Sequence, residues 1–234
     1  MCDDAPREYA EIPPHILSAP FLFLNIGGLK PTKEGWFCVN VQGGCDITRP
    51  MHDLRGLPDE AVSAIYSSHT LEHAGLGDGH AMATLKEWFR VLKPGGLLLI
   101  SVPDLPTLAR LYLSPSLSFE QRMKVMRMMY GAQSDQFDHH HVGFDDSLLL
   151  AAVAEAGFCN AERVGDFRLH DDTSAMRFLG VFISLNVAAH RCHSAAALAG
   201  AEAGAGAEVH TIQHHADKYN ASISDWSSLS LYDS

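Results

Sequence analysis

The sequence has no excess of positive charge. Its 234 residues include 17 Lys and Arg against 28 Asp and Glu, which gives a formal net charge of −11 at pH 7. A protein that holds DNA or RNA through phosphate contacts usually presents a basic surface. The composition therefore argues against nucleic acid as a partner and indicates an acidic, soluble protein.

The sequence also lacks long hydrophobic runs and any C-x-x-C pair. Its longest apolar run is far shorter than the roughly 20 residues that cross a bilayer, so no membrane segment is expected. The acidic, proline-containing start is unlike a signal peptide. An odd number of scattered cysteines fits reduced thiols in a cytoplasmic protein better than a disulfide framework. They are Cys2, Cys38, Cys45, Cys159 and Cys192.

Four short apolar runs predict buried β-strands. They are residues 21–26, 36–41, 63–68 and 96–102, each followed by glycine, proline or a polar residue. Runs this apolar are typical of strands covered on both faces, as in a parallel sheet. Apolar residues from Leu85 to Leu92 recur at helical spacing, and K-P-G-G at 93–96 predicts the end of that helix. The strand–helix–strand order predicts a right-handed parallel β-α-β unit.

Later segments complete the predicted domain. Two further helices are expected, over the methionine-rich residues 120–131 and over residues 145–157, and strands at 163–170 and 177–187 are expected to finish the sheet in antiparallel fashion. Three regions follow from this pattern. They are an irregular leader at 1–20, an α/β domain at 21–189, and an Ala/Gly- and Ser-rich flexible tail at 190–234.

The string SSHTLEH, residues 67–73, contains the H-x-x-E-H pattern of a class of zinc peptidases, at His69, Glu72 and His73. Two zinc ligands at this spacing must project from one face of a regular helix. Here His69 directly follows a predicted strand, and a glycine-rich segment begins right after His73, so at most about one helical turn fits. We therefore interpret the string as a loop that binds no metal and keep a zinc hydrolase only as a remote alternative.

Loops at the carboxyl ends of strands are where open α/β sheets bind their ligands. The ordered series NIGG, HDL, RVLKPGG, SVPDLPTLARL, GFDD and ISLNV resembles class I S-adenosylmethionine-dependent methyltransferases, most closely a bacterial subgroup of predicted methyltransferases. The resemblance covers residues 21–189. It implies a Rossmann-like, mostly parallel sheet with an antiparallel last strand, and S-adenosylmethionine as the cofactor.

Eight residues match positions that hold the cofactor in this family. The resemblance implies that glycines let the backbone approach the methionine part of the cofactor, because they carry no side chain. The eight are Asn25, Gly27 and Gly28 at the methionine end, Gln42 at the ribose, Asp53 and Leu54 at the adenine, and Ser68 and His69 in the loop after the third strand.

The sequence departs from the family pattern at three places. Leu29 replaces a glycine, and Gln42 replaces an acidic residue that accepts both ribose hydroxyls. An amide brings no charge, so this contact is expected to be weaker. Only GLKPTKEG, residues 28–35, connects the first two strands, fewer than the dozen or so residues of a helical crossover. The first crossover helix is therefore expected to be shortened or absent.

Methyl transfer from a sulfonium is an in-line displacement that mainly requires alignment. A hydroxyl acceptor also benefits from a general base. Among His73, Asp104 and His139–His141, we favour His73 and His141, then Asp104, which could instead cap the helix that follows it. We expect O-methylation of a small-molecule or glycan-type acceptor. The alternative is a non-catalytic cofactor-binding protein on the same fold, and the oligomeric state stays open.

Overall fold

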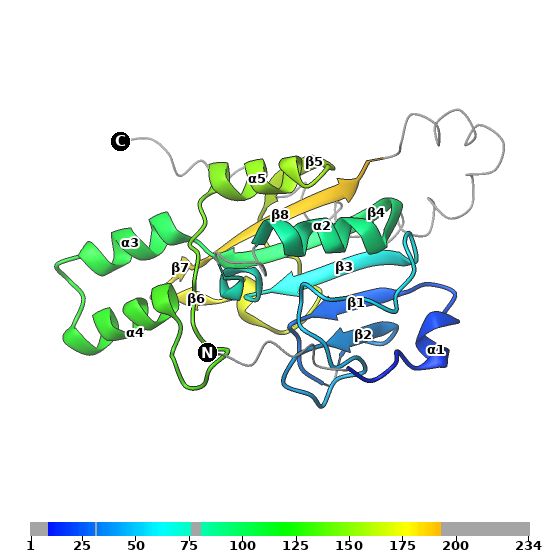
Figure 1. Cartoon of the computed structure of the whole chain (residues 1–234). Coiled ribbons are helices and arrows are strands. Elements are labelled where there is room, and N and C mark those ends of the chain that lie inside the picture. Colours follow the sequence, from blue (N-terminus) through cyan, green and yellow to red (C-terminus); the bar gives the residue numbers. More distant parts are fainter. Residues whose placement is uncertain (1–8, 31, 76–80, 193–234) are drawn as a thin grey trace, which may run out of the picture. The chain divides into compact units, whose positions relative to one another are not determined.

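The computed structural model describes residues 9–30, 32–75 and 81–192. Figure 1 shows its helices and strands. In chain order they are α1 (Pro14–Leu17), β1 (Phe23–Ile26), β2 (Trp36–Val39), β3 (Val62–Ser68), the 3-10 helix η1 (Leu71–His73), α2 (Ala81–Val91), β4 (Leu92–Pro103), α3 (Leu105–Leu113), α4 (Phe119–Tyr130), α5 (Asp146–Glu155), β5 (Phe158–Val164), the 3-10 helix η2 (Thr173–Ala175), β6 (Arg177–Phe178), β7 (Val181–Phe182) and β8 (Ser184–Arg191).

Six strands form one mostly parallel sheet in the order β2-β1-β3-β4-β8-β5. β1 pairs in parallel with β2 and β3, and β3 pairs in parallel with β4. β8 is antiparallel to both β4 and β5, so β5 runs with the first four strands. The parallel β3–α2–β4 unit and the Rossmann-like sheet with an antiparallel last strand are confirmed.

The connection between β1 and β2 contains no helix in its described residues, 28–30 and 32–35. This confirms the prediction of a shortened or absent first crossover helix. Residue 31 lies outside the described part. The short connection brings the ends of β1 and β2 together without the helix that usually separates them.

Three predicted elements have other bounds in the structure. Helix α2 ends at Val91, so K-P-G-G belongs to β4, where Leu92 already pairs with Val62 ahead of a shift in register. The strand predicted at 163–170 lies earlier, as β5, because residues 165–170 turn back so that Phe167 can pack on the ring of Tyr66. The last predicted strand, 177–187, is divided among β6, β7 and β8.

The main core lies between the sheet and helices α2 and α5. Trp88 of α2 and Val153 of α5 are fully buried there together with Ile65 of β3. On the other face, Tyr66 of β3 hydrogen-bonds Asp172 Oδ2 at 2.7 Å. Burial of β3 on both faces fits its nearly continuous apolar run.

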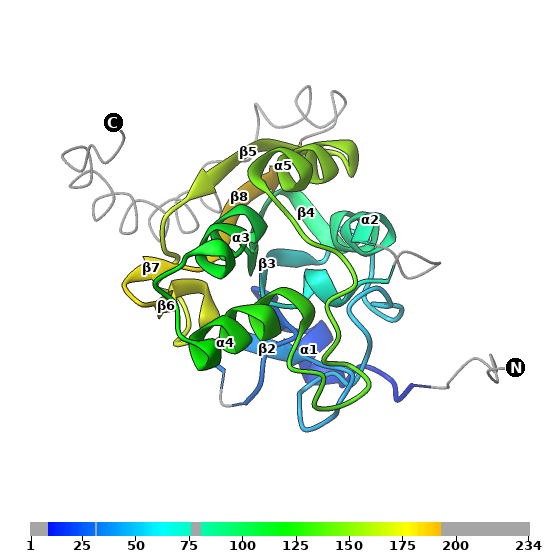
Figure 2. The ribbon, with the colours of Figure 1, turned by 90° about the vertical axis from the view of Figure 1, so that its left-hand side faces the viewer.

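Helices α3 and α4 lie side by side at the end of the sheet toward which the parallel strands point (Figures 1 and 2). A small second core holds them together, with Leu108 of α3 and Val125 of α4 fully buried. The chain that leaves α4 then runs beside η1, where the backbone N–H groups of His141 and Val142 bond the Glu72 carbonyl.

The structure describes part of the predicted leader but almost none of the predicted tail. Ile12 and Ile16 of the leader are buried in the main core, and α1 spans four residues of it. β8 extends to Arg191, and the remaining tail, residues 193–234, lies outside the described residues. The three domain boundaries stay predictions.

Four cysteines form two disulfides, Cys38–Cys45 and Cys159–Cys192, with Cα atoms 5.0 and 5.5 Å apart. The prediction of reduced thiols is therefore wrong for these four, because a turn and a strand pairing bring together residues that are scattered in the sequence. Cys2 lies outside the described residues. The cytoplasmic location that rested on these thiols stays a prediction. In the described ranges, no helix has the length and hydrophobicity needed to span a bilayer.

Candidate functional site

A cavity of about 530 Å³ opens at the carboxyl ends of β1, β2 and β3. This is the place where open α/β sheets bind ligands, because the loops that follow the strands meet there. Its wall consists of Gly27 and Leu29 after β1, residues 39–42 after β2, residues 49–52, residues 69–70 and 73–75 after β3, residues 134–138 after α4, and His141.

Hydrogen bonds tie the strand ends together around the cavity. Asn40 Nδ2 donates to the carbonyl oxygens of Gly27 and Gly28, at 3.2 and 3.1 Å. Thr70 Oγ1 donates to the Ile26 carbonyl at 3.3 Å. Gly27 has φ +80°, and a Cβ atom there would overlap the Thr70 hydroxyl, so this position requires glycine.

Three of the eight predicted cofactor residues line the cavity, namely Gly27, Gln42 and His69. The other five are not among its lining residues. They are Asn25, buried against Gly28, Gly28 itself, Asp53 and Leu54 before α2, and Ser68 at the end of β3.

Asp53 and Leu54 are engaged elsewhere. The Asp53 carboxylate accepts two hydrogen bonds from Arg55, at 2.8 and 2.7 Å, and these bonds lower the pKa of Asp53. Leu54 is fully buried, and its N–H donates to Glu87 Oε1 at 2.9 Å. The preceding residues, Met51 and His52, line the cavity instead.

The sequence did not reveal the segment at 134–138. It contributes Asp135, whose Oδ2 accepts a hydrogen bond from Gln42 Nε2 at 3.2 Å. These residues lie 93 positions apart in the chain, so no local pattern could have paired them. A carboxylate therefore lies beside Gln42. The family resemblance predicts a carboxylate here too, but one that belongs to the residue at the end of the second strand.

Two of the three predicted catalytic residues, His73 and His141, line the cavity, and Asp104 does not. Asp104 caps α3, where its Oδ1 accepts a bond from the Thr107 N–H at 3.0 Å. Its other oxygen accepts from Arg163 at 2.9 Å. Both contacts are structural, so the geometry explains Asp104 without a part in catalysis.

The Asp104→Ala variant is expected to lose about 1–2 kcal/mol of unfolding free energy, the usual cost of a lost N-cap. The ion pair adds little because the Arg163 side chain is 47% exposed. Urea denaturation measures this loss, with Asp145→Ala as the matched control, since Asp145 caps α5 in the same way. Full stability together with lost turnover would instead assign Asp104 to the chemistry.

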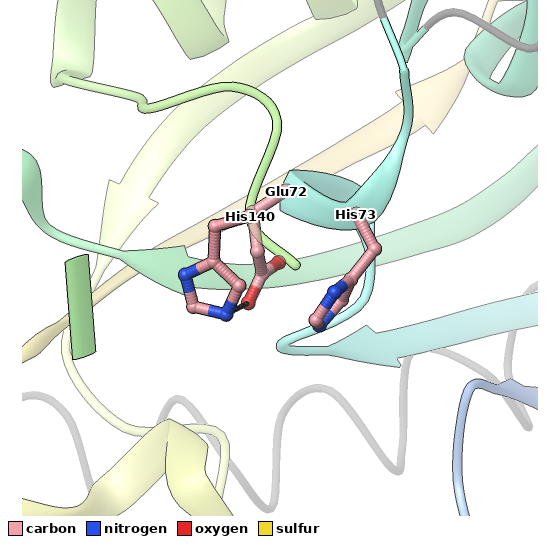
Figure 3. Close-up of side chains that lie close together, drawn as sticks. All are labelled: Glu72, His73 and His140. Carbon is pink, nitrogen blue, oxygen red and sulfur yellow. Dashed lines mark ion pairs between the residues drawn. The ribbon is translucent and has the colours of Figure 1, made fainter. Parts of the chain in front are cut away.

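A cluster of three ionisable side chains, drawn in Figure 3, includes His73 of the cavity wall. Glu72, His73 and His140 each offer a ligand atom, and these atoms all lie within 4.8 Å of one another. Glu72 is only 1% exposed, and its Oε1 lies 3.4 Å from His69 Nδ1 and 3.9 Å from His140 Nε2. Neither contact has the geometry of a hydrogen bond, and both Glu72 oxygens are without a hydrogen-bond partner.

Burial sets the protonation of this cluster. It raises the pKa of Glu72 to about 8 and lowers the pKa of His69 and His140 to about 4. Burial also lowers the pKa of His73. Near neutral pH the imidazoles are therefore uncharged, and each keeps one nitrogen lone pair.

Backbone bonds bring this cluster together from distant parts of the chain. The N–H groups of His141 and Val142 donate to the Glu72 carbonyl, at 2.8 and 3.3 Å. His73 Nδ1 bonds the His139 carbonyl at 3.0 Å. His69 has φ +50°, a strained conformation that is common at functional sites. Because η1 is a short 3-10 helix, His69 and His73 do not share one regular helical face, as predicted.

Comparisons with known proteins gave one family match and several similar solved structures. Residues 40–100 match a family model described as a methyltransferase domain. No curated protein matches the chain.

Three solved structures illustrate the similarity. The chain is 15% identical to a SAM-dependent methyltransferase from Archaeoglobus fulgidus, over 76% of this chain and 88% of that one, with a TM-score of 0.46. The chain is 14% identical to the 1,6-didemethyltoxoflavin-N1-methyltransferase of Burkholderia thailandensis, whose structure contains S-adenosylhomocysteine. That similarity covers 76% of this chain and 73% of the other, with a TM-score of 0.45. The chain is 18% identical to a SAM-dependent methyltransferase from Thermotoga maritima, over 72% of this chain and 81% of that one, with a TM-score of 0.44.

The matched segment, residues 40–100, runs from the end of β2 through β3 and α2 into β4. It thus covers the centre of the sheet and much of the cavity wall. Over this segment the chain is similar to a methyltransferase domain.

Proposed function

We propose that this protein transfers a methyl group from S-adenosylmethionine to an oxygen atom of a small-molecule or glycan-type acceptor. The observation that carries the proposal is the cavity at the carboxyl ends of β1–β3, which is bounded by Gly27, His69 and the 134–138 segment. We keep the bacterial subgroup named above as part of this proposal, together with the expectation that nucleic acid is not a partner.

The residues of the cavity fit the cofactor. Its volume lies within the roughly 300–1,000 Å³ of ordinary small-molecule sites. Gly27 leaves the cavity floor free of a side chain. Gln42 and Asp135 offer an amide oxygen and a carboxylate for the ribose hydroxyls. Met51 and His52 would border the adenine, in place of Asp53 and Leu54.

When bound, S-adenosylmethionine supplies a methyl group on a positively charged sulfur, which needs alignment more than activation. The protein's own contribution is to orient the acceptor and to take up its proton. His141 suits the second task, because its side chain is exposed to the cavity and its backbone N–H is fixed on the Glu72 carbonyl at 2.8 Å. A neutral imidazole accepts a hydroxyl proton near neutral pH.

Two observations favour a second candidate, a binding protein that holds the cofactor without turnover. Gln42 replaces the acidic residue of the family pattern, and the first crossover helix is absent from the described residues. Asp135 beside Gln42 restores a carboxylate, which favours the enzyme. Binding of S-adenosylhomocysteine without methyl transfer to any acceptor in a labelled-methyl screen would select the binding protein.

Calorimetry with S-adenosylhomocysteine tests the cofactor site. The unaltered protein is expected to bind one molecule per chain. The Asp135→Ala variant is expected to bind roughly 10–100-fold more weakly, because one hydrogen bond to a charged group is lost. The variant should keep its thermal stability, since Asp135 is exposed.

The matched control is Asp171→Ala, which removes an exposed carboxylate that does not line the cavity. It should bind like the parent. No binding by the parent would contradict the proposed function, and equal binding by all three proteins would place the ribose elsewhere.

A further inference from the structure

Glu72 is a buried carboxylate without a hydrogen-bond partner. It is 1% exposed, and neither of its oxygens accepts a hydrogen bond. Buried polar groups in native proteins are nearly always paired with protein, water or an ion, and an unpaired carboxylate in a low-dielectric interior is costly. An ionised Glu72 therefore needs a positively charged or proton-donating partner at this point.

His69 does not supply that partner when it is neutral. The Ser184 hydroxyl donates its hydrogen to the Thr173 carbonyl at 2.8 Å. Its oxygen must therefore accept from His69 Nε2, also at 2.8 Å. The lone pair of His69 then sits on Nδ1, which faces Glu72 Oε1 at 3.4 Å. When Glu72 is ionised, two acceptors thus face each other with no hydrogen atom between them.

A hydrogen bond also fixes which ring nitrogen of His73 carries the hydrogen atom. A carbonyl can only accept, so His73 Nδ1 must donate to the His139 carbonyl at 3.0 Å. The lone pair of a neutral His73 is then on Nε2. Metal-binding histidines are commonly fixed in this way, with one ring nitrogen donating to a backbone carbonyl.

His140 completes the group. Its Nε2 lies 3.9 Å from Glu72 Oε1, and its ring stands nearly perpendicular to that of His73, with ring centroids 4.7 Å apart. Figure 3 shows the Glu72 carboxylate between the two rings. The cluster therefore presents two imidazoles and one carboxylate around a single point.

We propose that Glu72, His73 and His140 bind a divalent ion of the first transition series, such as zinc or manganese, and that an open coordination position of this ion takes an oxygen atom of the methyl acceptor. Two imidazoles and one carboxylate suit these ions and leave at least one position free. Bonds of about 2.0–2.2 Å would hold ligand atoms roughly 3.4 Å apart. The 3.9 Å between Glu72 and His140 would thus close by about half an ångström.

The location of the cluster points to the acceptor. His73 belongs both to the cluster and to the cavity wall. An ion held there would lie beside the cavity at the end of β3, next to His141. A bound ion lowers the pKa of an oxygen ligand and orients it, which are the two needs of a hydroxyl acceptor. This second part of the proposal rests on the proposed function.

The proposal departs from the expectation that the H-x-x-E-H string binds no metal. That expectation concerned His69 and His73 as a helical pair, and the structure does separate these two. The third ligand comes from His140, 67 positions beyond His73 in the sequence (140 − 73), which sequence spacing could not indicate.

The test uses the full chain, freed of metal with a chelator and titrated calorimetrically with Zn²⁺, Mn²⁺, Co²⁺ and Mg²⁺ salts. At least one of the first three ions is expected to bind and to raise the melting temperature, whereas Mg²⁺ binds more weakly because it prefers all-oxygen ligands. The chain has 14 histidines, so stoichiometry alone does not locate the ion, and variants must do so.

Glu72→Gln and His140→Ala are expected to weaken binding at this site at least about 100-fold. His139→Ala is the matched control and should bind like the parent, because His139 contributes only its carbonyl to the cluster. Glu72→Gln keeps the shape of the buried side chain, so it serves if His140→Ala does not fold.

Two results would overturn the proposal. One is the absence of binding for all four ions. The other is binding that is the same in the parent and in Glu72→Gln. A parallel titration with S-adenosylhomocysteine separates the two ideas. Cofactor binding without metal binding would refute this inference alone, and metal binding without cofactor binding would refute the proposed function and leave the ion site standing.

Discussion

The His141→Ala variant is expected to turn over about 10²–10⁴-fold more slowly than the parent, the usual contribution of a general base. Its affinity for S-adenosylhomocysteine should not change, because the proposal places His141 on the acceptor side of the cavity. Its fold should also survive, since the side chain is exposed and the bond to the Glu72 carbonyl comes from the backbone.

The measurement compares kcat, with the acceptor found by a labelled-methyl screen, and the dissociation constant of S-adenosylhomocysteine. His15→Ala is the control, because His15 is an exposed histidine of α1 that does not line the cavity. A His141→Ala enzyme with unchanged kcat would contradict the role of His141 as the base.

The largest effect on stability is expected for Trp88→Ala. Trp88 belongs to α2, and its side chain is fully buried in the core between this helix and the sheet. Truncation of such a residue costs about 3–5 kcal/mol, because it removes apolar contacts and leaves a cavity. That is a large part of the 5–15 kcal/mol that usually holds a domain folded.

Urea denaturation measures the loss, with Phe119→Ala as control. Phe119 is also aromatic, but it is 74% exposed, so its loss should cost less than about 0.5 kcal/mol. A Trp88→Ala protein as stable as the parent would show that this core is placed wrongly.

A milder change at Trp88 would distinguish the effect of lost core packing from the effect of a lost contact to the cavity wall. Trp88 Nε1 donates to the Met51 carbonyl at 2.8 Å, and Met51 lines the cavity. Trp88→Phe keeps most of the packing and removes this bond. The core below α2 thus supports the cavity wall beside the proposed adenine position.

Local patterns were enough to predict the centre of the fold. The run at 63–68, the apolar stripe of α2 and the run at 96–102 each carry their signal within a few residues, and a parallel unit follows from their order. The short β1–β2 connection was also predictable, because chain length alone excludes a full helix.

The edge of the sheet was less predictable. β5 is an edge strand whose burial alternates weakly, and most of its side chains reach solvent. It lacks the apolar run that marks the central strands. The more apolar part of the following segment, around Phe167, packs on Tyr66 and forms no strand.

The candidate site was predictable only where it follows strand ends. Gly27, His69 and His73 lie directly after or near β1 and β3, so the fold places them. Asp135 and His140 reach the site from the chain after α4, through contacts far apart in the sequence. Such contacts leave no trace in local spacing, and this is why the carboxylate beside Gln42 and the Glu72 cluster were missed.

A structure of the protein soaked with S-adenosylhomocysteine tests the central claim most directly. The account predicts that the ligand fills the cavity between Gly27, His69 and the 134–138 segment, with its ribose at Gln42 and Asp135 and its sulfur toward His73 and His141. A cavity that stays empty at saturating ligand, or a ligand bound away from the carboxyl ends of β1–β3, would contradict it.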